Sequence, residues 1–242
     1  SVVIAANHYH CEVVGFYHGF NGLLHDEHIQ QAKQLTLKDI DNIIQRGGTI
    51  LKSARCPEML TAKGLIKAAT TLTNEKIDAL IVIGGDGSFK GLLDLQAHWS
   101  GQIIGIPGTI DNDLDNTDFT IGFATAVNTA IDAIDKIRDT ADAFERIFIV
   151  EVMGRHRGHI TFNVGIACGA EQVLSFENFS IDDKQATLQK LANEINTAQQ
   201  HHQGSYIIVL AENIWPGGAV ALAGELKHKA KVDCTACFLG HI

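Results

Sequence analysis

The sequence predicts an α/β protein built on an open, mostly parallel β-sheet, and two patterns lead to this prediction. Short, nearly continuous apolar runs, typical of buried strands, occur at residues 11–17, 77–83, 102–106, 147–152, 172–176 and 205–210. Longer segments of helical periodicity separate them. Strands that alternate with helices of this length form right-handed βαβ units, so we expect helices on both faces of the sheet.

Two of the expected helices have a clear apolar face. Residues 124–140 repeat apolar side chains at helical spacing, as Val127 and Ile134 illustrate, and residues 182–202 do the same. The first of these helices begins at the only natural seam in the chain, since no Pro-rich linker and no internal repeat is visible. We therefore expect two domains, residues 1–122 and 123–242.

Composition excludes several classes of protein. The chain has 242 residues with 19 Lys and Arg against 28 Asp and Glu, a formal charge of −9, which argues against binding to nucleic acid or to an acidic membrane surface. No apolar run reaches the roughly 18 residues needed to cross a bilayer. Five cysteines, an odd number, fit a reducing compartment better than a disulfide framework, so we expect a cytoplasmic protein.

Polar or Gly-rich segments follow four of the apolar runs, at residues 84–88, 107–113, 153–158 and 212–213. Ligands of open α/β sheets bind at the carboxyl ends of the strands. Several such ends with reactive side chains predict one shared crevice for a ligand.

The first of these segments, residues 84–88, is Gly-rich and opens a helix. Glycines allow the backbone to approach a phosphate, and the helix N-terminus supplies free N–H donors. Asp86 can hold a Mg²⁺ ion that the phosphates also bind. The alternative is an ordinary tight turn with an Asp cap.

The second segment gathers Thr109, Asp111, Asn112 and Asp113 directly after an apolar run. Such a cluster is costly to desolvate without a function. One carboxylate could accept a proton from a substrate hydroxyl while the other holds a metal or orients its neighbour. An Asx-rich surface loop is the alternative interpretation.

Arginine is scarce, yet three of the six arginines lie within twelve residues, as Arg146, Arg155 and Arg157. The planar guanidinium fork suits phosphate oxygens, so this span predicts a local anion site in an acidic protein. The alternative is surface solubility. The Cys234 and Cys237 pair lacks the further ligands of a zinc site, and we expect structural cysteines there.

These residues together favour phosphoryl transfer, in which the protein mainly positions the reactants and neutralises charge while an Asp takes the proton of the acceptor. The sequence also resembles a known family. It is similar to the bacterial-type ATP-dependent 6-phosphofructokinases over essentially its whole length, with IGGDGS at residues 83–88 as the nucleotide loop, PGTIDND at 107–113 as the catalytic loop and VEVMGR at 150–155 as the sugar-phosphate loop.

The resemblance implies two Rossmann-like three-layer αβα domains with mostly parallel sheets and an active site in the cleft between them. Residues 1–122 would form the nucleotide domain and residues 123–242 the fructose 6-phosphate domain. The family continues beyond both ends of this sequence, so the resemblance also implies a fragment that lacks both ends.

The resemblance assigns roles to individual residues. Asp111 would be the general base toward the 1-hydroxyl of fructose 6-phosphate, with Asp113 in support and with Thr109 and Arg155 stabilising the phosphoryl group. The residues implied for ATP are Arg55, Cys56, Gly85, Asp86 as the Mg²⁺ ligand, Gly87 and Ser88. The residues implied for the sugar phosphate are Thr109, Ile110, Asp111, Arg146, Met153, Gly154, Arg155, Glu212 and His241. Arg146 would serve a neighbouring active site, which implies a homo-oligomer, either a dimer or a tetramer.

Two positions bear on the phosphoryl donor. Pyrophosphate-dependent relatives usually carry Asp and Lys where this chain has Gly87 and Gly108, so the resemblance favours ATP. The other interpretations are a pyrophosphate-dependent phosphofructokinase, a kinase of the diacylglycerol and NAD kinase group, and a non-catalytic regulatory subunit. The last two are disfavoured by the catalytic loop and by the intact pair of Asp86 and Asp111.

The sequence departs from the family at its effector site and at one substrate position. Thr235 stands where a second Arg donated by the neighbour is expected. Arg138, Gly169 and Glu171 match the bacterial site for ADP or phosphoenolpyruvate, and we read them as a remnant of it. Basic residues of that site are replaced by Ile4, His201, Gln203 and Ser205. The sequence therefore predicts that effector control is lost or altered.

Overall fold

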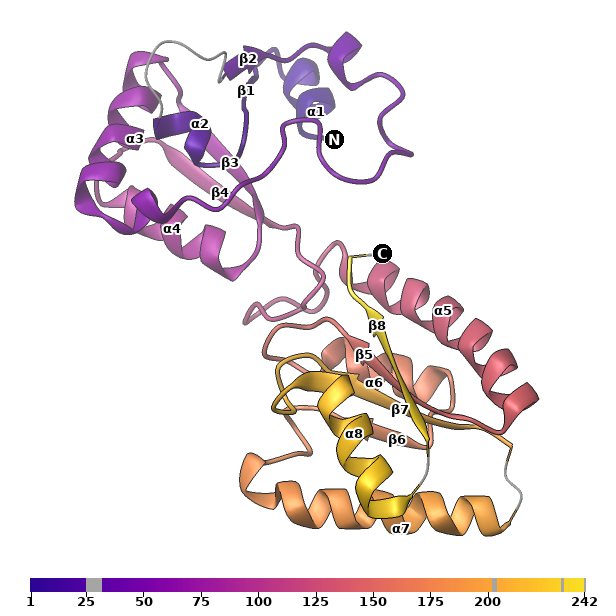
Figure 1. Ribbon diagram of the computed structural model, residues 1–242. Helices are drawn as coiled ribbons and strands as arrows, with labels where there is room; N and C mark the ends of the chain where they lie inside the picture. Colours follow the sequence, from indigo (N-terminus) through magenta and orange to yellow (C-terminus); the bar gives the residue numbers. More distant parts are fainter. Residues whose placement is uncertain (25–31, 202–203, 232, 242) are drawn as a thin grey trace. The chain divides into compact units, whose positions relative to one another are not determined.

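We analysed a computed structural model that describes residues 1–24, 32–201, 204–231 and 233–241 (Figure 1). The chain divides into two compact units, Ser1–Ile106 and Pro107–Ile242. This division precedes the loop at residues 107–122, whereas the boundary expected from the sequence follows it. Backbone bonds tie the two ends of this loop together, because the Ile121 N–H donates to the Pro107 carbonyl at 2.9 Å and the Gly122 N–H donates to the Thr109 carbonyl at 3.1 Å.

The first unit contains two small sheets and several helices. Its helices are α1 (Val2–His8), α2 (Asn21–Leu24), α3 (Ala62–Asn74) and α4 (Asp86–Gln96), with short 3₁₀ helices at Leu37–Ile40 and Pro57–Leu60. Its strands are β1 (Val14–Phe16), β2 (Ala32–Gln34), β3 (Ala79–Gly84) and β4 (Gln102–Pro107). Strand β1 pairs antiparallel with β2, and β3 pairs with β4.

The second unit is a four-stranded parallel sheet with the strand order β6-β7-β5-β8. Its strands are β5 (Ile147–Val152), β6 (Gln172–Leu174), β7 (Tyr206–Ala211) and β8 (Cys234–Leu239). Its helices are α5 (Phe123–Phe144), α6 (His159–Ala167), α7 (Lys184–Gln200) and α8 (Gly218–Ala230), with a short 3₁₀ helix at Ile181–Asp183. The parallel sheet predicted from the apolar runs is confirmed here.

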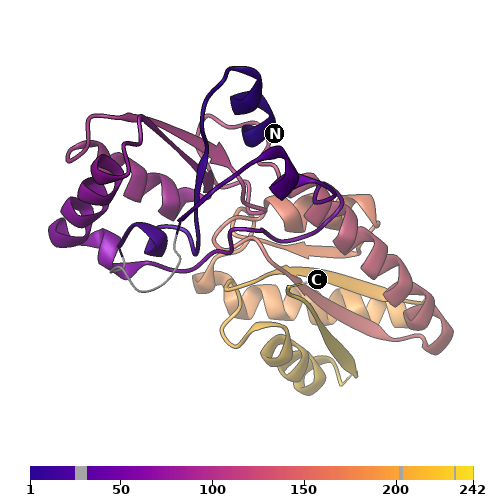
Figure 2. The ribbon, with the colours of Figure 1, turned by 90° about the horizontal axis from the view of Figure 1, so that it is seen from above.

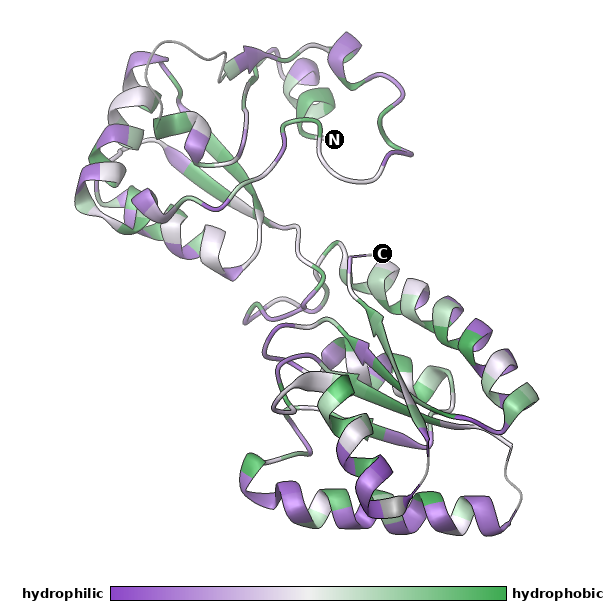
Figure 3. Cartoon of the chain, viewed as in Figure 1, coloured by the Kyte–Doolittle hydropathy of each residue, from purple (hydrophilic) through white to green (hydrophobic). Residues whose placement is uncertain are grey.

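Helices cover both faces of this sheet, as predicted, because side chains alternate between the faces along each strand. Ile147 and Ile149 of β5 pack toward α7 and α8, whereas Phe148 and Val150 pack toward α5 and α6. Figure 2 shows α5 and α8 on opposite sides of the sheet. The strands are mostly apolar while α7 alternates apolar and polar residues (Figure 3), as expected for a sheet buried on both faces.

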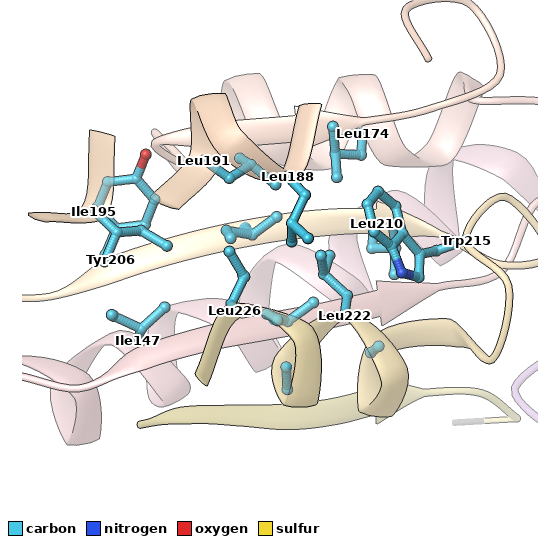
Figure 4. Close-up of a cluster of buried hydrophobic side chains, with 14 of the residues drawn as sticks. Ile147, Leu174, Leu188, Leu191, Ile195, Tyr206, Leu210, Trp215, Leu222 and Leu226 are labelled. Atoms are coloured by element: carbon cyan, nitrogen blue, oxygen red, sulfur yellow. The ribbon is translucent and has the colours of Figure 1, made fainter. Parts of the chain in front are cut away.

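The larger core lies between this sheet and helices α7 and α8 (Figure 4). Ile195, Ile208 and Leu222 are fully buried in it, and Trp215 closes it near the carboxyl ends of the strands. A rigid core at this place fixes the strand ends, from which the loops with the candidate site residues leave.

Strand β8 was not among the predicted runs, although it contains the Cys234 and Cys237 pair. Cys234 packs against the core on the α7 and α8 face, while Cys237 packs on the α5 and α6 face. The two thiols therefore point to opposite sides of the sheet and contribute packing surface. Within the described part of the chain, no helix combines the length and the apolar character required to span a membrane.

Candidate active site

The loops after β5, β7 and β8 leave the sheet at the same level. Val152 at the end of β5 is paired in register with Ala211 at the end of β7 and with Leu239 at the end of β8. Loop 153–158, the pair Glu212 and Asn213, and His241 therefore lie at one edge of the sheet. This is the edge at which open parallel sheets bind their ligands.

The turn at Gly154 and Arg155 is held by the carboxylate of Glu212. Glu212 Oε1 accepts the N–H of Gly154 at 3.1 Å and the N–H of Arg155 at 2.6 Å. The backbone of Gly154 has φ 147°, and a Cβ there would lie 2.7 Å from the carbonyl oxygen of Arg157. Arg155 itself adopts the left-handed conformation with φ 58°, which few non-glycine residues adopt. The turn thus requires glycine at 154 and external support at 155.

The loop at residues 107–122 presents the two candidate carboxylates. Asn112 sits between them with φ 53°, and its side-chain oxygen accepts the N–H of Thr120 at 2.8 Å. Its side-chain amide donates to the carbonyl of Asp118 at 3.3 Å. The hydroxyl oxygen of Thr109 accepts the N–H of Asp111 at 3.2 Å, and the Thr109 hydroxyl is also hydrogen-bonded to the Asp111 side chain.

The loop at residues 107–122 and the loop at residues 153–158 are joined by a pair of opposite charges. Arg155 Nη1 lies 3.9 Å from Asp113 Oδ2, and the Asp113 side chain is only 13% exposed. The other oxygen of Asp113, Oδ1, is buried and has no hydrogen-bond partner. A buried carboxylate oxygen without a partner is costly, so this atom is oriented to receive a donor or a cation from a ligand complex.

Asp111 is half-buried beside these charges. Burial raises its pKa above the ordinary value of an aspartate, and the like charges of Asp113 and Glu212 raise it further. The Arg155 guanidinium and the hydrogen bond with Thr109 act in the opposite direction and only partly compensate. A carboxylate with a raised pKa is a stronger base, as proton abstraction from a hydroxyl requires.

In the first unit, the Gly-rich segment lies between β3 and α4 as predicted. Gly84 is required by packing, because a Cβ there would lie 2.5 Å from the hydroxyl oxygen of Ser88. Asp86 is the first residue of α4, and its Oδ2 pairs with Lys90 Nζ at 2.8 Å. A Cβ at Gly87 would meet no atom within 4 Å, so the fold itself does not require glycine at this position.

The side chains of this segment show whether it can bind a magnesium ion. Mg²⁺ is usually held by one or two carboxylates together with substrate phosphates and water. The Asp86 carboxylate is 35% exposed at the start of a helix of eleven residues, where phosphates can also bind. Asp86 therefore fits Mg²⁺ held jointly with a nucleotide. The described residues contain no group of three or more His, Cys, Asp or Glu side chains placed to hold a metal by themselves.

The remaining residues predicted for ATP differ in their surroundings. Arg55 is exposed, and its carbonyl accepts the side-chain amide of Asn21 at 3.2 Å. Cys56 precedes a short 3₁₀ helix and packs against the hydrophobic core of the first unit, and this burial raises the pKa of its thiol. Ser88 donates its backbone N–H to the Gly85 carbonyl at 3.0 Å, which continues the turn into α4.

Arg146 and Thr235 lie at the other edge of the sheet. Arg146 immediately precedes β5, and its guanidinium stacks on Phe144 with 4.6 Å to the ring centroid. Thr235 is the second residue of β8 and is paired in register with Phe148. The length of β5 therefore separates Arg146 from the loop that contains Arg155.

Arg138 on α5 is the central donor of a separate hydrogen-bond network. Its Nη1 donates to Glu171 Oε1 at 3.3 Å and to Ser205 Oγ at 3.4 Å. Its Nη2 donates to the carbonyls of Cys168 and Gly169, both at 3.0 Å. The residues read as an effector remnant are thus joined to one another. Gln203, another position of that predicted site, lies outside the described residues.

Three residues of this region were given no individual role by the sequence. Asn112 and Asn213 both adopt the left-handed conformation and hold the loops that contain Asp111 and Arg155, and Glu177 accepts the N–H of Gly158 at 3.0 Å. For Asn112 and Asn213, the sequence signal is an Asn next to a predicted site residue. Asn adopts the left-handed conformation more readily than most residues.

A comparison with known families decides the classification. The family model described as phosphofructokinase matches residues 1–242. The chain belongs to the phosphofructokinase family. This finding confirms the family and the enzyme class, ATP-dependent 6-phosphofructokinase, that the sequence motifs predict.

Curated phosphofructokinases align with the whole chain. It is 44% identical to ATP-dependent 6-phosphofructokinase 1 of Thermus thermophilus and 46% identical to ATP-dependent 6-phosphofructokinase of Clostridioides difficile, over 242 residues in each case. These alignments cover 100% of this chain and 72% of each relative.

Solved phosphofructokinase structures share the fold. The structure of phosphofructokinase from Saccharomyces cerevisiae matches 99% of this chain with a TM-score of 0.80 and 29% identity, and the enzyme from Pichia pastoris matches with 0.83 and 29%. The matched regions span 35% and 27% of those chains.

The charges around Asp111 generate a pH prediction. If Asp111 is the base that the sequence predicts, it must be ionised to act, and activity is lost as the pH falls through its raised pKa. Replacing Asp113 by Asn removes a neighbouring negative charge that raises this pKa, so the acid limb of the kcat/KM profile should move to lower pH by a few tenths of a unit to about one unit.

The matched control is Asp115→Asn on the same loop, where the residue is exposed and does not contribute to the Asp111 shift. Its profile should keep the wild-type acid limb. An unchanged midpoint in Asp113→Asn, or a shift to higher pH, would contradict the electrostatic description of the site.

Proposed function

We propose that the protein transfers the γ-phosphoryl group of ATP to the 1-hydroxyl of D-fructose 6-phosphate, giving fructose 1,6-bisphosphate and ADP. The observation that carries this proposal is the half-buried Asp111, whose pKa is raised, beside the Arg155 guanidinium in the second unit. A strong base beside a fixed cation is the arrangement that transfer of a phosphoryl group to an alcohol requires.

Asp111 takes the proton of the acceptor hydroxyl as the oxygen attacks the γ-phosphorus. Its raised pKa brings its proton affinity closer to that of the developing alkoxide, which favours the transfer. Asp113 supports this function by keeping a negative charge beside the base and by anchoring Arg155 through their 3.9 Å contact.

Arg155 and Thr109 stabilise the phosphoryl group in flight. The Arg155 side chain is 53% exposed, so its fork of donors can reach the oxygens of a bound phosphate. The Thr109 hydroxyl is hydrogen-bonded to Asp111 here and turns its proton to a phosphoryl oxygen when the ligand binds. Both residues supply hydrogen-bond donors where negative charge is shared during transfer.

The first unit binds the nucleotide. Gly85, Gly87 and Ser88 surround the phosphates at the start of α4, and Arg55 and Cys56 add contacts to ATP. Asp86 would hold the Mg²⁺ ion, which neutralises phosphate charge when bound. The open space at Gly87 leaves room for a nucleotide in the first unit, and the glycine at 108 supports the same donor through the resemblance to ATP-dependent relatives.

The sugar phosphate lies at the carboxyl edge of the parallel sheet. Met153 and Gly154 follow β5, Glu212 follows β7, His241 follows β8, and Ile110 belongs to the catalytic loop. The in-register strand ends bring the first four of these positions to one edge, which is the support for this assignment.

Replacing Asp111 by Asn tests the proposed base. Because Asn cannot accept the proton, we expect kcat with ATP and fructose 6-phosphate to fall by about 10²–10⁴-fold. ATP binding should be retained, and the melting temperature should be unchanged or higher, because a half-buried charge near like charges is removed.

The assay is run with ATP and with pyrophosphate in parallel. Wild-type activity with ATP and its loss in Asp111→Asn support the proposal. Activity only with pyrophosphate would identify the other donor class, and equal activity in wild type and variant would refute the role of Asp111. No activity with either donor would favour a regulatory subunit.

Arg146 acts in the active site of a neighbouring subunit in a homo-oligomer. The support is geometric, since β5 separates Arg146 from the sugar-phosphate loop of its own unit. Thr235 is paired with Phe148, the second residue of β5, and Arg146 directly precedes β5. The two positions that we assign to the neighbouring subunit therefore lie at the same edge of the sheet. With Thr235 in place of a second guanidinium, we assign the contact with the neighbour's sugar phosphate to Arg146.

Mixing two inactive variants tests whether Arg146 acts in trans. Arg146→Ala and Asp111→Asn are each refolded alone and then together. Random pairing in a two-fold interface should give about a quarter of the sites both an intact Asp111 and a neighbour with an intact Arg146, so activity should reappear. Mixtures that stay as inactive as the separate variants would show that Arg146 acts within its own subunit or not at all.

The remnant of the effector site does not bind effectors. Arg138 already donates to four acceptors within the second unit, and Ile4 and Ser205 provide no charge for a phosphate. At a fixed, subsaturating concentration of fructose 6-phosphate, we expect ADP and phosphoenolpyruvate to change the rate by less than about twofold. The concentrations of both compounds are kept below those at which they compete with the substrates. A several-fold change that Arg138→Ala abolishes would contradict this expectation.

A further inference from the structure

The loop that contains Arg155 is fixed at its two ends by carboxylates from different strands. Glu212, after β7, accepts the N–H of Gly154 at the entry, and Glu177, after β6, accepts the N–H of Gly158 at the exit. The N–H of Arg157 donates to the Gly154 carbonyl at 3.0 Å and closes the turn between them. These bonds fix the backbone at both ends of the loop. The two peptides on either side of Arg155 need further contacts to be fixed as well.

Both peptides around Arg155 are held by two consecutive residues. Its N–H donates to Glu212 Oε1 at 2.6 Å, and its carbonyl accepts the side-chain amide of Asn213 at 3.1 Å. Residues Glu212 and Asn213 thus hold Arg155 from both sides. This matters because Arg155 has φ 58°, a conformation that is unfavourable for an L-residue and persists only when the surroundings impose it.

Asn213 is itself adapted to this task. It has φ 62°, which turns the chain directly after β7, and Asn is among the few side chains that adopt this conformation readily. In an extended conformation, the residue after Glu212 would continue the strand direction instead of turning at this point. The left-handed backbone and the bond to Arg155 therefore belong to one arrangement.

We infer that Asn213 is a positioning residue for Arg155: its side-chain amide holds the Arg155 carbonyl, keeps the left-handed turn and so directs the guanidinium toward the phosphoryl group. This inference rests on the function proposed for Arg155. Asn213 acts through the backbone of Arg155, to whose carbonyl its side-chain amide donates.

Replacing Asn213 by Gly isolates the hydrogen bond from the backbone conformation. Glycine adopts φ 62° without strain, so the chain can still turn after β7, while the amide that holds Arg155 is lost. We expect kcat to fall on the order of tenfold, because a small displacement of a group that stabilises the transition state reduces turnover. The KM for ATP, which binds the first unit, should stay within about twofold of the wild-type value.

Asn213→Asp is the second variant, because it preserves the shape of the side chain and removes the donor. The matched control is Asn163→Ala, since the Asn163 amide also donates to a backbone carbonyl, that of His159 at 2.8 Å, on the exposed side of α6. This control should keep the wild-type kcat. Melting temperatures of all variants identify any that fail to fold.

A double-mutant comparison distinguishes positioning from general destabilisation. If Asn213 acts through Arg155, Asn213→Gly should have less than about a twofold effect on kcat when Arg155 is already Ala. A persistent tenfold loss in that background would overturn the inference. The inference would also be overturned if Asn213→Gly and Asn213→Asp fold and keep the wild-type kcat while Arg155→Ala is strongly impaired.

The same set of variants separates this inference from the proposed function. If Arg155→Ala keeps full activity, the role of Arg155 in phosphoryl transfer is wrong, and the inference fails with it. If Arg155→Ala is impaired and the Asn213 variants are not, only the inference fails, and the function proposed for Arg155 stands.

Discussion

The carboxylate of Glu212 is the interaction on which the candidate site depends. It joins the ends of β5 and β7 by accepting two N–H groups from the Gly154 and Arg155 turn. A charged acceptor makes these hydrogen bonds stronger than neutral ones. The bond to Arg155 helps to keep an arginine in a left-handed backbone, and the same charge contributes to the raised pKa of Asp111. One side chain thus couples the geometry of the cation to the basicity of the carboxylate.

The charge balance of the site explains how an acidic protein can bind anionic substrates. The chain has a formal charge of −9, and the charges that act on Asp111 are the carboxylates of Asp113 and Glu212 and the guanidinium of Arg155. This surplus of carboxylates is unfavourable for a bound phosphate by itself. It becomes favourable when a substrate brings a proton for Asp111 to accept and a divalent cation to share with the carboxylates. The site therefore suits a metal-bound phosphate ester better than a free anion.

The strands and helices of the second unit could largely be predicted from the sequence, because continuous apolar runs and helical stripes reflect burial directly. Strand β5 has the predicted bounds, and α5 and α7 extend or shorten the predicted helices by only a few residues. Strand β2 could not be predicted, because its three residues, Ala32–Gln34, have no apolar pattern. Strand β8 was not among the predicted apolar runs, because Thr235 and the small residues beside it make the run less apolar than the others.

The residue types of the site were predictable, but the contacts that hold them were not. Asp111 and Arg155 follow apolar runs in segments whose polar content signals a ligand. The bond from Glu212 to Arg155 joins residues 57 positions apart, and the bond from Asn213 joins residues 58 positions apart. Such pairings depend on strand order and register, which the sequence does not state. The left-handed backbone of Arg155 follows from these contacts and has no local sequence signal.

A crystal structure with fructose 6-phosphate and a non-hydrolysable ATP analogue tests the central claim most directly. The account predicts that the 1-hydroxyl oxygen lies within about 2.6–3.2 Å of an Asp111 carboxylate oxygen, with the Arg155 guanidinium on the γ-phosphate. A complex in which the 1-hydroxyl points away from Asp111, or in which Arg155 binds no phosphate, would contradict it.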